Sequence, residues 1–91
     1  MPSIDIRRTH QGTPEEARIA IEMAMQSIAT KFGIRHEWDG DRVEFSRGGV
    51  QGHIEIELHA VHVHARLGLM LAAMKPVIER EIQSCLDRAF D

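Results

Sequence analysis

The sequence has no tyrosine, one cysteine and few aromatic residues, which make up 4% of its 91 residues. A lone cysteine, Cys85, excludes an internal disulfide and a cysteine-rich zinc site, and it is typical of a reducing compartment. The first eight residues lack the apolar run of a signal peptide, and no stretch reaches the roughly 18 apolar residues of a membrane span. We therefore expect a cytoplasmic protein without a transmembrane segment.

The charge balance is equally plain. The net charge is −3, no acidic or basic block stands out, and the sequence pI is near 6.0. A general nucleic-acid binder needs a basic face to neutralise phosphates, so we expect no nucleic-acid partner. Apolar residues at 43% and charged residues at 27% are ordinary globular values. At this length they predict a single domain over residues 1–91.

The first third of the chain predicts a strand and a helix. Ser3–Arg7 alternates apolar and polar side chains, which is typical of a strand. Thr13, Pro14 and Glu16 form a helix start with an N-cap, a first-turn proline and a capping box. Gly33 supplies the stop. The apolar residues between them share one side of a helix and predict a buried stripe: Ala17, Ile21, Ala24, Met25, Ile28 and Phe32.

From Ile34 to Leu67 the apolar pattern has a period of two, and three tight turns set the pairing of four strands. Turns at Asp39-Gly40 and Gly48-Gly49 and a third turn centred on His59-Ala60 place nearly all the apolar residues on one face. The first turn puts Ile34 and His36 on the face of Val43 and Phe45, the second pairs Phe45 with Gly52 and Val43 with Ile54, and the third pairs Leu58 with Val61, Ile56 with Val63 and Ile54 with Ala65.

The last segment, Gly68 to Phe90, returns to helical spacing. Its stripe of Leu71, Met74, Ile78, Ile82, Cys85 and Ala89 stays in phase across Pro76. We interpret it as one helix kinked at Pro76, with a separate helix beginning there as the alternative. The predicted fold class is α+β, in the order β-α-β-β-β-β-α, with two helices on one face of an antiparallel sheet. TBP-like and small helix-grip folds share this order.

Several short motifs resemble those of a known family. They are Ile6-Arg7-Arg8-Thr9-His10, Glu15-Glu16-Ala17-Arg18, Lys31-Phe32-Gly33, Trp38-Asp39-Gly40-Asp41, Phe45-Ser46-Arg47-Gly48-Gly49-Val50-Gln51-Gly52, Leu67-Gly68 and Pro76-Val77-Ile78-Glu79-Arg80-Glu81-Ile82. The chain resembles the polyhydroxyalkanoic acid system proteins, small bacterial proteins associated with polyhydroxyalkanoate storage. The resemblance covers nearly the whole chain and implies a role in that storage, but it supplies no catalytic residues.

Histidines and carboxylates gather on the outward face of the predicted third hairpin. The predicted register pairs Glu57 with His62, Glu55 with His64 and His53 with Arg66, and it sets Glu44 beside His53. These residues could form a metal site, since His62 and His64 point the same way and carboxylates lie opposite. A solvated ladder of cross-strand charge pairs is the interpretation we favour, because an open face lacks the surrounding groups that fix ligands. A proton-sensing role lies between the two. We expect no metal and no cofactor.

Other reactive side chains predict no catalysis. His36 points inward without a neighbouring nucleophile, so a hydrogen-bonded interior or edge histidine is expected. His10 is assigned to a solvated strand end, and Cys85 to the buried stripe of the last helix. Gly48-Gly49 is a hairpin turn and not a phosphate loop, because no helix start follows it. The sequence therefore predicts a non-enzyme.

Some apolar residues are not accounted for by the core stripes. The predicted interaction surface consists of Ile19, Met23, Leu69, Met70, Ala73 and Val77. Burial by the sheet is one alternative, and a homodimer, a protein partner or a granule contact is the other. Two function classes follow. One is a non-enzymatic accessory protein of polyhydroxyalkanoate storage, cytoplasmic or granule-associated. The other is a small-ligand-binding helix-grip module, which a short chain with a filled core disfavours.

Overall fold

The computed structural model describes residues 3–90 and has the predicted order of elements, a β-α-β-β-β-β-α arrangement with one short 3-10 helix added. The elements are β1 (Ser3–Thr9), α1 (Pro14–Phe32), β2 (Arg35–Asp39), β3 (Arg42–Arg47), β4 (Val50–Ile56), β5 (Ala60–Leu67), the 3-10 helix η1 (Leu69–Met74) and α2 (Lys75–Phe90).

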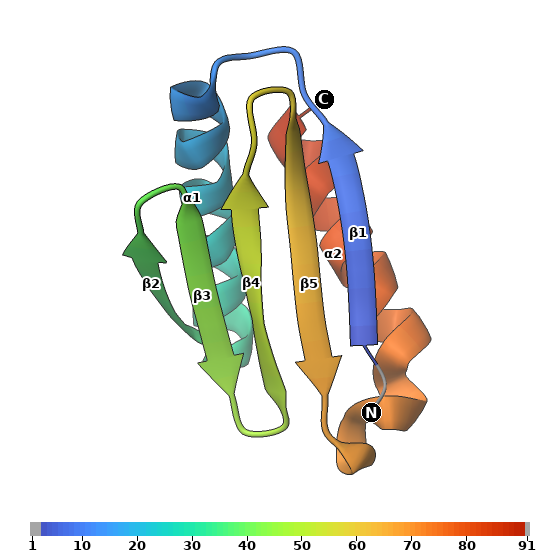
Figure 1. Cartoon of the computed structure of the whole chain (residues 1–91). Helices are drawn as coiled ribbons and strands as arrows, with labels where there is room; N and C mark the ends of the chain where they lie inside the picture. Colours follow the sequence, from blue (N-terminus) through green and yellow to red (C-terminus); the bar gives the residue numbers. More distant parts are fainter. Residues whose placement is uncertain (1–2, 91) are drawn as a thin grey trace.

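The five strands form one antiparallel sheet in the order β1-β5-β4-β3-β2. Strands β2 to β5 follow one another as a meander, and β1 joins the far side of β5. Both helices lie behind the sheet in Figure 1, on the same face, and they run antiparallel to each other. The predicted α+β class is confirmed. The other face of the sheet is left open.

Helix α1 begins and ends as its sequence predicts. The Thr13 hydroxyl accepts a hydrogen bond from the backbone N–H of Glu16 at 3.1 Å, and the Glu16 carboxylate accepts one from the N–H of Thr13 at 3.0 Å. At the other end Gly33 has a φ of 68°, a left-handed conformation that glycine adopts without strain. These caps determine the residues at which α1 begins and ends.

Alternating side chains of the sheet meet the helices to form the core. Its largest fully buried side chains are Ile4, Ile21, Val43, Val61, Val63 and Leu67. Three side chains that we assigned to the core are exposed instead. Phe32, Leu58 and Met74 are 37%, 65% and 46% exposed. Phe32 and Met74 lie at the last residue of their helices, where the core no longer covers them, and Leu58 lies in a turn.

Gly52 sits where two elements leave no room for a side chain. It pairs with Phe45 on β3 and Ala65 on β5, as part of the helix-facing row. A Cβ atom built on Gly52 would lie 2.8 Å from Cζ of Phe45 and 2.3 Å from the carbonyl oxygen of His64. The phenyl ring therefore occupies the space that a larger residue would need, and a glycine is required here.

The predicted register of the third hairpin is wrong by two residues. Val61 lies opposite Ile56, and Val63 lies opposite Ile54. The loop consists of Leu58 and His59, because the N–H of Glu57 donates to the carbonyl of Ala60 at 2.8 Å. A shift of two keeps every side chain on its face, so the alternating pattern could not distinguish the two registers.

The interpretation of the last segment as one kinked helix is also wrong. Leu69–Met74 forms η1, and α2 begins at Lys75, with Pro76 in its first turn. A proline is favourable there because the first N–H groups of a helix have no partner within the helix. The chain changes direction at this junction (Figure 1). The apolar stripe continues through it, which is why the sequence suggested a single helix.

Candidate functional sites

A cluster of histidines and charged side chains lies on the open face, where β1 and β5 are neighbours. His62 and His64 point the same way and share one carboxylate. Nε2 of His62 contacts Oδ1 of Asp5, and Nδ1 of His64 lies 3.6 Å from Oδ2 of Asp5. The hydrogen bond from His62 holds the pKa of Asp5 below its ordinary value. The open-face cluster is therefore centred on the Asp5 carboxylate of β1 and the two histidines of β5 that contact it.

His53 extends the cluster across β4. Its ring lies 5.6 Å from that of His64, and its Nδ1 accepts a hydrogen bond from Nη2 of Arg42 at 3.1 Å. Burial, followed by the nearby Arg42 guanidinium, lowers the pKa of His53. Arg42 also lies 3.7 Å from the Glu55 carboxylate. The lowered pKa favours a neutral His53 ring, which accepts the hydrogen bond from Arg42.

The observed register of β4 and β5 gives these histidines different partners from the predicted ones. Glu55 lies opposite His62, and His53 lies opposite His64, whereas Glu57 ion-pairs with Arg7 at 3.3 Å. The predicted position of Glu44 beside His53 is confirmed. Within residues 3–90, no group of three potential ligands is arranged to hold a metal ion. The cluster offers a carboxylate, imidazole rings and a guanidinium on an open face, where a polar or charged partner could contact them.

Asp5 was missed because its role depends on β1 pairing with β5, some 57 residues away in the chain. No turn joins these strands, so local sequence signals carry no information on their register. The only available hint was the alternation of β1, which puts Asp5 on the face opposite Ile4 and Ile6.

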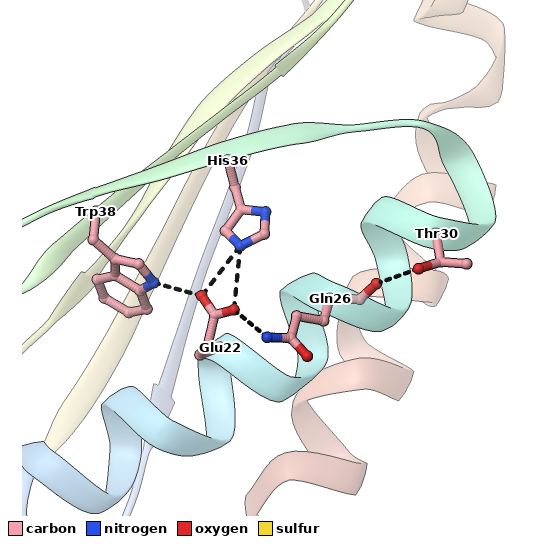
Figure 2. Close-up of polar contacts among 5 residues, drawn as sticks. All are labelled: Glu22, Gln26, Thr30, His36 and Trp38. Atoms are coloured by element: carbon pink, nitrogen blue, oxygen red, sulfur yellow. Dashed lines mark hydrogen bonds and ion pairs between the residues drawn. The ribbon is translucent and has the colours of Figure 1, made fainter.

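A second polar cluster joins α1 to the edge strand β2 on the other face (Figure 2). Oε1 of Glu22 accepts a hydrogen bond from the indole nitrogen of Trp38 at 2.7 Å and lies 3.1 Å from Nε2 of His36. Oε2 accepts from the side-chain amide of Gln26 at 2.8 Å. These contacts, with the Trp38 bond first, lower the pKa of Glu22. The Arg18 guanidinium completes the cluster, 4.7 Å from the centre of the Trp38 ring.

His36 is thus a hydrogen-bonded edge histidine, as predicted, while its partner Glu22 was missed. His10 corrects our prediction of a solvated strand end. It is 7% exposed, its ring stacks on Phe90 at 5.8 Å, and its Nε2 lies 3.2 Å from the carbonyl oxygen of Glu57. Arg8 reaches Asp87 of α2 in the same region. Arg8 lies on β1 and His10 directly follows it, and both residues fasten α2 to the sheet.

The six apolar residues of the predicted interaction surface are all exposed, but they lie in two separate places. Ile19 and Met23 are on α1. Met23 lines a groove of about 290 Å³ between the two α-helices, which we call the interhelical groove. Cys85, buried as predicted, also lines it. The other members of the groove are Ala20, Ala24, Ser27, Arg88 and Ala89.

The remaining four residues belong to η1 and the start of α2. Leu69 is 83% exposed and Met70 is 94% exposed, so these two neighbouring side chains stand almost entirely in solvent. Ala73, Met74 and Val77 are exposed beside them. We call these five residues the apolar tip. Along α2, Val77 of the tip and Cys85 of the groove are eight residues apart, which at 1.5 Å per residue is about 12 Å.

The fold and these surfaces define a small α+β protein with one polar open face, one helix-covered face and an exposed apolar end. A family model described as "putative polyhydroxyalkanoic acid system protein" matches residues 4–90, and the chain belongs to this family. No curated protein and no solved structure matches the chain. The likeness to TBP-like and helix-grip folds therefore stays a prediction. No helix within residues 3–90 is both long and apolar enough to cross a membrane.

Proposed function

We propose that this protein is a non-enzymatic accessory component of polyhydroxyalkanoate storage that acts by binding to the surface of the storage granule. The apolar tip is the observation that carries the proposal. A monomer in water gains nothing by exposing Leu69 and Met70 side by side, whereas contact with an apolar polyester would remove both from water. Family membership supplies the cellular setting.

The polar clusters support binding over catalysis. Glu22 and Asp5 are held as carboxylates by several partners each, and a general acid or base needs a freer group with a pKa close to the working pH. The filled layer between sheet and helices likewise favours a surface contact over an enclosed ligand. Ile21, Val63 and Leu67 are each at most 1% exposed there.

We further propose that two copies of the chain associate through the outer face of the helices. Ile19 and Met23 project four residues apart beside the interhelical groove, whose other walls are mostly small side chains. The projecting side chains of Ile19 and Met23 and the groove lie on the same surface, so this surface can pair with a second copy of itself, as a two-fold symmetric interface requires. The apolar tip remains free in this arrangement.

The granule proposal is tested in cells that accumulate the polyester. A fluorescent fusion of the intact chain should outline the granules, and Leu69→Glu with Met70→Glu should make it diffuse. Leu58→Glu is the matched control, since Leu58 is a 65% exposed apolar residue in the β4–β5 turn. A diffuse wild-type signal while granules are present, or equal loss in the control, would contradict the proposal.

A further inference from the structure

Charge is distributed unevenly along the sheet, and the end that bears the apolar tip is basic. Two neighbouring rows of paired residues cross the sheet at this end. From β1 to β2, the first row consists of Ser3, Arg66, Gln51, Ser46 and Arg35. The second row consists of Leu67, Val50 and Arg47, from β5 to β3. All charged side chains in these two rows are arginines. Arg35, Arg47 and Arg66 are exposed and make no ion pair among the described residues.

The tip is joined directly to this basic end. The N–H of Gly68 donates to the carbonyl of Gly49 at 2.8 Å, which ties the start of η1 to the β3–β4 turn beside Arg47. The Leu71 side chain packs against the same turn. Lys75 follows η1 and lies 3.8 Å from the Glu79 carboxylate. Figure 1 shows η1 projecting beyond the strand ends here.

The opposite end of the sheet has a different character. Its last complete row runs through Arg7, His62, Glu55, Arg42 and Asp39, and Glu57 and Asp41 follow in the adjoining turns. Acidic and basic side chains are therefore mixed at that end, where Arg7 ion-pairs with Glu57 at 3.3 Å and Arg42 lies 3.7 Å from the Glu55 carboxylate. A surface that is both negative and apolar would therefore attract the basic end of the molecule more strongly than the mixed end.

We propose that this end docks on an anionic lipid surface. Leu69 and Met70 enter the boundary between headgroups and acyl chains, and Arg47 and Arg66 contact the phosphates beside them. Exposed apolar side chains supply the insertion, while guanidinium groups, which suit phosphate oxygens, supply the preference for negative headgroups. The inference rests on the proposed granule-surface role, because it names the chemistry through which the same tip would bind.

Vesicle binding by the intact protein tests this directly. Vesicles of phosphatidylcholine and phosphatidylglycerol in a two-to-one ratio should bind the protein and sediment with it. Pure phosphatidylcholine should bind it at least about tenfold more weakly, since each arginine near an anionic surface is worth about fivefold in affinity. Binding to the mixed vesicles should weaken as salt is raised. Equal binding to both vesicles, or none to either, would overturn the inference.

Two sets of variants separate the parts of the tip. Leu69→Ser with Met70→Ser should weaken binding to the mixed vesicles by about tenfold or more. Arg47→Gln with Arg66→Gln should remove most of the preference for the anionic vesicles. Leu58→Ser, at an apolar residue that is 65% exposed in the β4–β5 turn, should bind like the wild type. Circular dichroism confirms that each variant is folded, and equal losses in all three sets would contradict the assignment.

The two proposals fail in different ways. Granule recruitment without binding to anionic vesicles would overturn the lipid inference and leave the granule role standing, with the polyester or a granule protein as the contact. Vesicle binding without granule recruitment would overturn the granule role and leave the lipid chemistry of the tip in place.

Discussion

Single residues anchor the edge of this sheet, and Glu22 is the clearest case. Strand β2 is the last strand of the sheet and packs on α1 mainly through Trp38 and His36, which both point at the Glu22 carboxylate (Figure 2). A carboxylate that accepts several hydrogen bonds prefers to be ionised. The attachment of β2 therefore depends on the charge of one side chain.

Glu22→Gln should reduce the free energy of unfolding at neutral pH by about 1 kcal/mol, because the hydrogen bonds lose their charged acceptor. The pKa of Glu22 is below its ordinary value of 4.5 in the folded protein. Its contribution is thus complete above pH 4.5 and is lost as pH falls through the lower folded pKa. Urea unfolding from pH 7 downward should show the wild type and the variant converging in acid.

Glu37→Gln is the matched control for this prediction. Glu37 lies on β2 but faces the open side, exposed and opposite Glu44. Its substitution should leave stability nearly unchanged or raise it slightly. A Glu22→Gln deficit that stays constant with pH, or one that the Glu37 variant reproduces, would show that charge at Glu22 does not hold β2.

At the scale of elements, the junction between η1 and α2 determines where the apolar tip points. Pro76 has no N–H to donate and lies in the first turn of α2, where none is needed. Pro76→Ala should therefore retain the helix content measured by circular dichroism. It should lower the free energy of unfolding by less than about 1 kcal/mol, chiefly because the unfolded chain becomes more flexible. A loss above about 3 kcal/mol would mean that the ring itself braces the junction.

Elements with local chemical signals were predictable from the sequence, and those without them were not. The capping box of Thr13 and the turns at Gly40 and Gly49 depend only on residues that are close together in the sequence, and the structure confirms all three. The third turn lacks glycine, and a slip of two residues preserves its pattern. The two polar clusters depend on contacts between distant segments, so Asp5 and Glu22 could not be identified as their centres.

At the scale of the whole molecule, the two exposed apolar regions have different proposed partners. If the helix faces join two chains about a two-fold axis that sets both apolar tips on one side, a granule or lipid surface can bind both tips of a dimer. Binding through two linked sites is stronger than through one without any new contact. Self-association would therefore strengthen the surface contact.

We expect the purified chain to form a dimer at micromolar concentration. Light scattering behind a sizing column should give twice the chain mass of 10.3 kDa. Ile19→Glu with Met23→Glu should yield folded monomers, because carboxylates would be buried against the partner. Leu69→Glu should stay dimeric. A wild-type monomer, or dissociation by Leu69→Glu alone, would contradict association through the helices.

The two outer strands of the sheet bear on how the protein avoids aggregation. Within the described residues, β1 and β2 each have a neighbour on one side only, so their other backbone groups could template a foreign strand. Strand β2 is five residues long, and its outward positions alternate Arg35, Glu37 and Asp39. Two copies of β2 paired antiparallel about their centres would bring Glu37 against Glu37, while each Arg35 would face Asp39 of the other copy. The short length of β2 and the pair of glutamates at its centre thus limit sheet extension at this edge.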